Sequence, residues 1–207
     1  MMKYYKLTDE KGQTNEDTQW GENITHRAIG EGSELCTQDV IHVYDHPLKA
    51  AMFNPIHANF TIPHLWECRV RKVVANDGLK VGVKSCTTIK EIPLPEITME
   101  QRVRFAIYCS LEVYSDKDFI KWANNWLNGK DRTAEAVRAA ARAAKEAPWT
   151  AARAAEEAVR AAARAAWRAA EEAAWAAARA AAWAAEEAVR ATREINFIKL
   201  IKKAMVK

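Results

Sequence analysis

The feature that most constrains this 207-residue chain is an alanine-rich segment, from residue 134 to residue 193. Between Asp131 and Glu194 half of the residues are alanine, none is glycine, and the only proline is Pro148. Alanine has the highest helix propensity, with Arg and Glu close behind, whereas an interior proline removes a backbone donor and clashes with the preceding turn. The segment therefore predicts a short helix over about 133–147 and a long helix over about 149–194, with a break at Pro148.

The predicted long helix contains a repeat of 15 residues, marked by glutamate pairs at 156–157, 171–172 and 186–187. Trp and Arg recur at fixed positions between the pairs, three to four residues apart, so they form one stripe opposite a face of methyl groups. The stripe is either a solvated face held by local pairs, or a surface for phosphates and bases, or a face buried against the rest of the chain. The methyl face permits close approach of a second copy, and we expect its alanines to mediate oligomerisation: Ala163, Ala166, Ala170, Ala174, Ala178 and Ala181.

Composition changes abruptly near residue 130. All seven glycines lie at or before Gly129, and five of the six prolines precede residue 96. This change predicts an α+β domain over 1–130, an alanine-rich helical rod over 131–194, and a basic amphipathic segment over 195–207. We expect the last segment to fold back on a core or on a partner, because its apolar residues depart from the alanine pattern.

Charge and hydropathy narrow the possible partners. The net charge of +4 is small, which argues against nucleic acid as a partner. The alanine-rich segment carries too many Arg and Glu residues to span a bilayer, and the N-terminal residues contain no apolar run typical of a signal peptide. We therefore expect a soluble, cytoplasmic protein without a membrane span.

The first 130 residues predict a small, mostly antiparallel sheet with helices. β-rich patterns predict strands at 3–8, 25–29, 40–44 and 86–92, and a hairpin that joins 65–74 to 79–83 around Asn76-Asp77-Gly78. A short helix, with Pro47 in its first turn and residues 48–53 as its body, is inserted between them, and two helices follow Pro95. The predicted fold class is α+β, followed by the long alanine-rich C-terminal helix.

Local signals set the ends of these helices. Asp45 is the expected cap of the inserted helix, and Asn54-Pro55 its expected end. Thr98 and Ser115 each precede a Gln or Asp by three residues, an arrangement typical of a capping box. Gly129 is the expected C′ glycine of the last of these helices.

Chemistry-bearing residues are few and scattered. The cysteines lack paired spacing, and three of the four lie in apolar stretches, which favours reduced, buried thiols: Cys36, Cys68, Cys86 and Cys109. The histidines also lack the paired spacing of zinc sites, so no metal site is predicted. Phosphate-binding glycine loops and the nucleophile elbow are absent, so the sequence predicts neither a cofactor nor a catalytic residue.

One region could hold a small ligand. Polar aromatic side chains gather where the strand over 40–44 leads into the inserted helix, and a helix N-terminus favours an anion. If a small-molecule site exists, we expect it at the end of this strand, lined by His42, Tyr44, His57, Arg102 and Arg104.

Several motifs together resemble one protein family. They are Trp20-Gly21-Glu22, Leu35-Cys36 leading to Ile41-His42-Val43-Tyr44, the run from Asn54 to Asn59, and the run from Thr87 to Ile107. With the alanine-rich tail, they resemble a family of uncharacterised proteins of tailed bacteriophages and prophages. The resemblance implies a phage accessory protein that acts in the host bacterial cytoplasm.

Related members carry Gly-Leu-His where this chain has Val40-Ile41-His42. That pattern is loosely similar to the nicotinamide-binding strand of ADP-ribosyltransferases. The leading hypothesis is a non-catalytic, oligomeric phage protein that binds a host protein or a nucleotide-like ligand to counter a host defence. The alternatives are an ADP-ribosyltransferase-like enzyme, and a structural virion protein assembled through the alanine-rich helix.

Overall fold

A computed structural model describes residues 2–113, 115–132 and 195–206. They belong to two compact units, Met1–Glu96 and Ile97–Lys207. The described residues contain antiparallel sheets and four α-helices, which makes the fold α+β, as predicted. The predicted long alanine-rich helix, its break at Pro148 and the six alanines of its methyl face lie outside the described residues.

The division between the units falls well before residue 130, where composition changes. The helices α2 (Met99–Val113) and α3 (Lys117–Leu127) follow the division and pack with the C-terminal helix α7 (Phe197–Met205) or with each other. The change in composition near residue 130 marks the start of the alanine-rich segment. The division between the compact units lies earlier, because α2 and α3 pack within the second unit.

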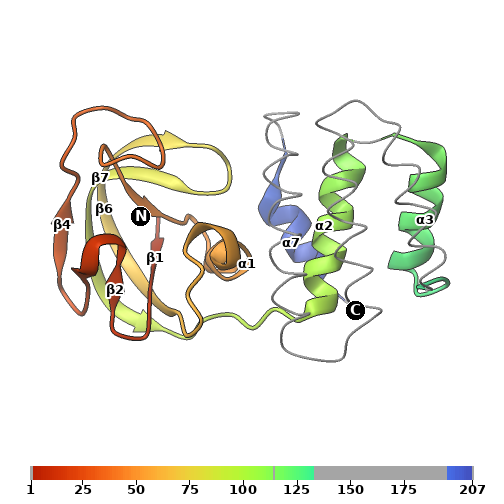
Figure 1. The fold of residues 1–207 in the computed structure, drawn as a ribbon, viewed down its shortest axis with the longest axis horizontal. Coiled ribbons are helices and arrows are strands. Elements are labelled where there is room, and N and C mark those ends of the chain that lie inside the picture. Colours follow the sequence, from red (N-terminus) through yellow and green to blue (C-terminus); the bar gives the residue numbers. More distant parts are fainter. Residues whose placement is uncertain (1, 114, 133–194, 207) are drawn as a thin grey trace. The chain divides into compact units, whose positions relative to one another are not determined.

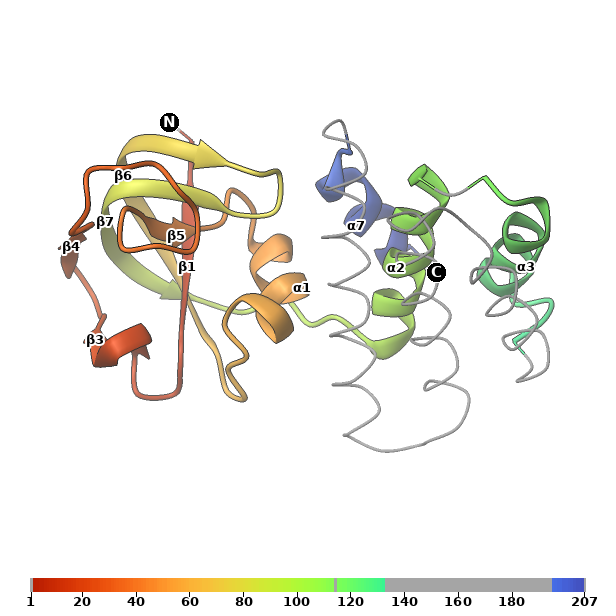
Figure 2. The same cartoon turned by 45° about the horizontal axis from the view of Figure 1, so that its top comes forward.

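The first unit is built on a long hairpin of β6 (His64–Asn76) and β7 (Val81–Ile92) (Figure 1). The strand β1 (Tyr4–Thr8) pairs antiparallel with β6. The other edge of β7 pairs with β5 (Ile41–Val43) and, further along, with β4 (Thr25–Arg27). Backbone hydrogen bonds of 2.8 Å in both directions between Tyr5 and Tyr44 then join the end of β5 back to β1, so the sheet curls into a small barrel (Figure 2).

The hairpin turn predicted at Asn76-Asp77-Gly78 is confirmed. Gly78 has a φ of 85°, and Asp77 Oδ1 accepts hydrogen bonds from the amides of Leu79 (2.9 Å) and Lys80 (2.8 Å). The separate strand predicted from residue 86 is wrong, because β7 continues from Val81 to Ile92. Non-local pairing with β6, β5 and β4 carries the strand through Lys84-Ser85, where the local pattern suggested a break.

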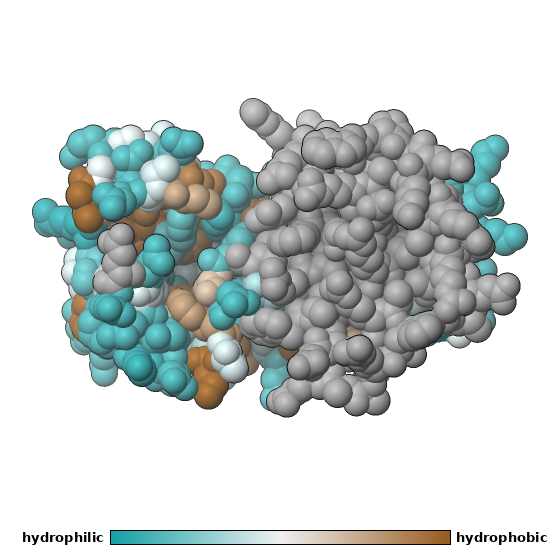
Figure 3. Space-filling model, in the orientation of Figure 1, coloured by the Kyte–Doolittle hydropathy of each residue, from teal (hydrophilic) through white to brown (hydrophobic). Residues whose placement is uncertain are grey.

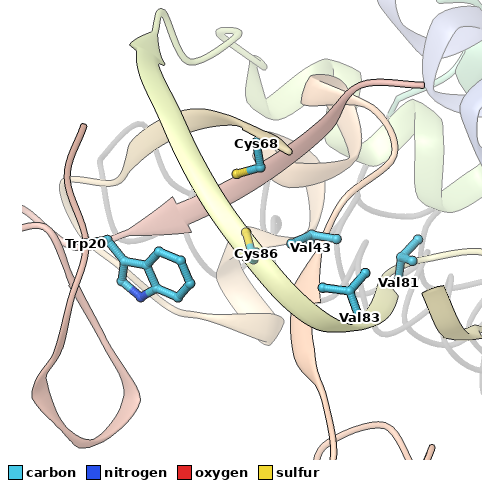
Figure 4. Packing of buried hydrophobic residues seen from close by; sticks show 6 residues of the cluster. All are labelled: Trp20, Val43, Cys68, Val81, Val83 and Cys86. Carbon is cyan, nitrogen blue, oxygen red and sulfur yellow. The ribbon is translucent and has the colours of Figure 1, made fainter. Parts of the chain in front are cut away.

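The interior of the barrel is apolar around two thiols. Figure 4 shows this cluster, whose buried members come from the barrel strands and one loop: Trp20, Val43, Cys68, Val81, Val83 and Cys86. Trp20 follows a small hairpin of β2 (Gln13–Thr14) and β3 (Thr18–Gln19), joined by the 3-10 turn η1 (Asn15–Asp17). Its indole Nε1 donates to Thr14 Oγ1 at 2.8 Å, which fixes the ring as it enters the core.

The inserted helix is α1 (Pro47–His57). Pro47 lies in its first turn, as predicted, but the predicted cap and the predicted C-terminal end are wrong. Its cap is His46, whose Nδ1 accepts a 3.1 Å hydrogen bond from the Leu48 amide, while Asp45 forms an ion pair with Lys49 instead. The helix also continues through Pro55. It ends at His57 because the buried Asn54 side chain binds both backbone groups of Phe60, which turns the chain away.

The helix ends in the second unit follow local chemistry. The Thr98 capping box is confirmed: the Gln101 amide donates to Thr98 Oγ1 at 3.2 Å, and Gln101 Oε1 accepts from the Thr98 amide at 2.8 Å. The predicted cap at Ser115 is wrong, because Asp116 Oδ1 accepts from the Phe119 amide at 2.8 Å. Gly129 is the predicted C′ residue, with a φ of 70° and a 3.1 Å bond from its amide to Trp126 O.

The C-terminal segment folds back on the second unit, which confirms that expectation. Figures 1 and 2 both show α7 beside α2. Phe197 is buried against Phe105, with ring centroids 6.4 Å apart, and Gln101 Nε2 donates to Met205 O at 3.4 Å. The ammonium of Lys203 lies 4.2 Å from the ring centroid of Tyr108, so the basic side of α7 also contributes to this packing.

Candidate functional site

Three of the five predicted ligand residues come together in the first unit. His42 lies on β5, Tyr44 follows the end of that strand, and His57 is the last residue of α1. The Tyr44 hydroxyl is 3.2 Å from His57 Nδ1, and the two rings are stacked with centroids 6.0 Å apart. The closure of β5 onto β1 and the packing of α1 against β1 therefore gather these aromatic groups.

His42 is held in its neutral form. Its Nε2 accepts a 2.9 Å hydrogen bond from the Cys36 amide, which requires that this nitrogen carry no proton. The pKa of His42 is lowered to about 4, mainly by burial and in addition by the nearby positive charges of Lys80 and Lys6. At neutral pH His42 is therefore an uncharged hydrogen-bonding group.

Lys6 places an amine inside the barrel. Its Nζ donates to His42 O at 3.1 Å and lies 5.0 Å from the ring centroid of Trp20. Burial lowers the pKa of Lys6, while the thiols of Cys68 and Cys86 act in the opposite direction. The amine is thus held by one carbonyl and one indole, in surroundings that disfavour its charge.

Tyr44 remains protonated at neutral pH. Burial raises the pKa of its phenol above the usual range, and the negative charge of Asp77 raises it further. A protonated Tyr44 can donate its hydroxyl hydrogen to His57 Nδ1.

A second amine lies close to the same group. Lys80 Nζ is 3.1 Å from the sulfur of the exposed Cys36, whose backbone φ is 66° and whose amide binds His42. Lys80 follows the hairpin turn, and its amide is bound by Asp77. The site thus combines two lysine amines, two histidines and a phenol, which the chain brings together from β1, β5, α1 and the β6–β7 turn.

Arg102 and Arg104 belong to the second unit, on α2. Arg104 Nη1 donates to Leu127 O at 3.1 Å and Nη2 to the Tyr108 hydroxyl at 3.4 Å, so this side chain ties α2 to the end of α3. Burial lowers the pKa of Arg102 to about 10. These contacts give Arg104 a structural role in its own unit.

The N-terminus of α1 lacks the free amides that would favour an anion. Pro47 has no amide hydrogen, and the Leu48 amide is already bound by His46. The Asp45 carboxylate also lies at this end, in an ion pair with Lys49. The amines near His42 come from the side chains of Lys6 and Lys80 instead, and the sequence predicted neither of them. The available signal was alternation in β1, which places Lys6 on the same face as the partly buried Tyr4.

The described part of the chain contains no group of three His, Cys, Asp or Glu side chains placed to hold a metal ion. Among the described residues, no helix is long and apolar enough to cross a membrane. Comparisons with protein-family models, with curated proteins and with solved structures found no match for this chain.

Proposed function

We propose that this chain is a phage accessory protein that binds a nucleotide-like ligand or a host protein without catalysing a reaction. The proposed setting is the host bacterial cytoplasm, and the proposed role is to counter a host defence. The sequence resemblance described above supports the phage setting. The group around His42 supports ligand binding, because it combines positive charge with uncharged hydrogen-bonding groups.

The observation that carries the ligand hypothesis is the position of the Lys80 amine beside the neutral imidazole of His42. Lys80 lies close enough for its charge to lower the pKa of the imidazole, whereas the buried Lys6 amine donates to the His42 carbonyl. Ammonium groups are common partners of phosphates, while histidine and tyrosine hydrogen-bond to ribose hydroxyls and base edges. A phosphate-bearing nucleoside derivative satisfies both kinds of group.

The pKa values of His42 and Tyr44 suit a binding site better than a catalytic site. A general acid or base works best when its pKa lies near the working pH, whereas the pKa of His42 is about 4 and that of Tyr44 is raised above its usual range. The carboxylate that acts on both groups is Asp77, and its Oδ1 is occupied by two turn amides. We therefore propose no reaction at this site.

Calorimetric titration with ADP-ribose tests the proposal, with inorganic phosphate as a second probe. We expect saturable binding of ADP-ribose to the wild-type protein and a loss of at least about tenfold in the His42→Ala variant, equivalent to about 1.4 kcal/mol. His64→Ala is the matched control, because His64 forms its ion pair with Glu91 on β7. Thermal melting of each variant shows whether it remains folded.

Two results would count against the proposal. One is the absence of saturable binding by the wild-type protein, or equal losses in the two histidine variants. The other is release of nicotinamide when the protein is incubated with NAD, since this would replace a binder by an enzyme.

A further inference from the structure

The outer face of the barrel carries a cluster of arginines that the ligand site does not use. Two rows of side chains cross β4, β7 and β6. One row is Thr25, Thr87 and Arg69, and the other is Arg27, Ser85 and Arg71. We call these six residues the arginine face.

The six side chains point to the same side of the sheet. Residues directly opposite each other on paired strands share a face, and the 2.8 Å hydrogen bond between Thr25 Oγ1 and Thr87 Oγ1 confirms this for one pair. Val70 and Cys86, which alternate with them, pack in the barrel core. The arginine face is therefore the outer surface, and its three arginines are exposed.

Nothing in the described part of the chain neutralises these arginines. Arg27, Arg69 and Arg71 take part in no side-chain hydrogen bond or ion pair there. The other three members of the face are hydroxyl residues, and none is a carboxylate. Residues 1–96 hold eleven Lys and Arg against thirteen Asp and Glu, so three free arginines are concentrated on one face of a slightly acidic unit.

Among its described residues, the first unit shows no large apolar surface on which a partner could dock. In Figure 3 the hydrophobic colour on the visible side of the first unit forms separate patches in a mostly hydrophilic surface. Its large exposed apolar side chains are Met2, Ile29, Ile62 and Val73. Single exposed apolar residues of this kind are common on soluble proteins. Like charges placed close together on a sheet repel one another, so a partner of opposite charge would be favoured at the arginine face.

The spacing of the arginines suits a polyanion with regular charges. Arg69 and Arg71 are two residues apart on one strand, about 6.6 Å, and Arg27 is two strands from Arg71, about 9.6 Å. Guanidinium groups bind phosphate oxygens in a bidentate manner, and Ser and Thr hydroxyls commonly add contacts to the same backbone. The face thus offers three cations and three hydroxyls to successive phosphates.

We propose that the arginine face binds the phosphate backbone of duplex DNA without reading its sequence. Duplex DNA carries about one negative charge per 1.7 Å of its axis, the charge density that such a face complements. None of the six side chains is aromatic, so the face lacks the stacking platform on which single strands depend. This inference concerns a surface separate from the residues proposed for ligand binding, and it stands if that proposal fails.

Fluorescence anisotropy of a short labelled DNA duplex, measured with the full chain over a range of low salt concentrations, tests the inference. If three phosphates are neutralised, the slope of log affinity against log salt should be about −2.7. The triple variant Arg27→Gln, Arg69→Gln, Arg71→Gln should lose most of this slope. The control variant Lys11→Gln, Lys117→Gln, Lys121→Gln also removes three exposed positive charges and should bind like the wild type.

Three outcomes would overturn the inference. The first is equal affinity for the duplex in the two triple variants. The second is tighter binding of the corresponding single strand than of the duplex. The third is equally tight binding of poly-glutamate at the same salt, which would assign the face to an acidic protein partner. Circular dichroism establishes that each exposed-site variant is folded.

Discussion

At the scale of single residues, His42 links the proposed ligand site to the stability of the first unit. The Cys36 amide binds the unprotonated Nε2, and this contact holds Cys36 in a left-handed backbone conformation. Protonation of His42 would remove the acceptor and add a positive charge beside Lys80 and Lys6. The unit should therefore lose stability when His42 becomes charged.

This loss gives a pH dependence with a defined sign. The pKa of His42 is about 4 in the folded protein and 6.5 for an ordinary histidine, so between these values the unfolded chain binds more protons. Stability should fall as the pH decreases from about 6.5 to about 4, by an amount whose upper bound is on the order of 3 kcal/mol. His42→Gln keeps an acceptor for the Cys36 amide and should reduce the change in urea midpoint between about pH 7 and pH 5.

The control is His64→Gln. His64 is partly exposed and forms an ion pair with Glu91 when it is protonated, so removing it should not flatten the pH dependence. If both variants flatten the pH dependence equally, or if His42→Gln leaves it unchanged, His42 is not the titrating group.

The sequence predicted the aromatic residues of the site, but it did not predict the two lysines beside them. His42 and Tyr44 are close in sequence, and His57 follows on the next predicted helix, so local patterns were enough to group them. Lys6 reaches the site only because β5 closes onto β1, and Lys80 only because the hairpin turn lies near β5. Arg102 and Arg104 were grouped with these residues, although they belong to the other compact unit.

At the scale of elements, local chemistry predicted most element positions and several ends. The hairpin turn at Asn76-Asp77-Gly78 and the capping box at Thr98 depend on neighbours within three residues, and both are confirmed. The continuity of β7 depends on three partner strands, and the passage of α1 through Pro55 is followed by a clamp from Asn54 to Phe60. Such non-local effects are not visible in a window of adjacent residues.

The start of α3 allows a direct comparison of two candidate caps. Asp116 Oδ1 binds the Phe119 amide at 2.8 Å, and the residue has an extended backbone, as an N-cap requires. We expect Asp116→Ala to lower the free energy of unfolding by about 1 kcal/mol, since it leaves a helix amide without its partner. Ser115→Ala is the matched control and should change stability by less than about 0.5 kcal/mol. Urea denaturation followed by tryptophan fluorescence measures both, because Trp122 and Trp126 lie on the same helix. A larger effect of Ser115→Ala would restore the cap predicted from the sequence.

At the scale of the whole molecule, the net charge of the chain does not show how charged side chains are distributed over its surface. The net charge of +4 argued against a nucleic-acid partner, yet strand pairing places Arg27 beside Ser85 and Arg71 on one face. Arg27 and Arg71 are 44 positions apart in the sequence, and only the pairing of β4 and β6 with β7 brings them onto one surface. The net charge does not reveal this cluster of arginines, because acidic residues elsewhere in the unit cancel their charge in the sum.

Self-association through the alanine-rich segment stays a prediction, because the residues concerned lie outside the described part of the chain. The methyl face expected from the sequence would allow two helices to approach closely, and a two-fold axis would let each copy cover the other. We expect light scattering to give the full chain a mass above that of one copy. The double variant Ala163→Glu, Ala178→Glu places charges on this face and should reduce the mass to one copy. Ala161→Glu, Ala176→Glu is the matched control, since each position lies two residues earlier and, at about 3.6 residues per turn, almost opposite on a helix. A wild-type protein that stays monomeric, or equal effects of the two double variants, would rule out assembly through this face.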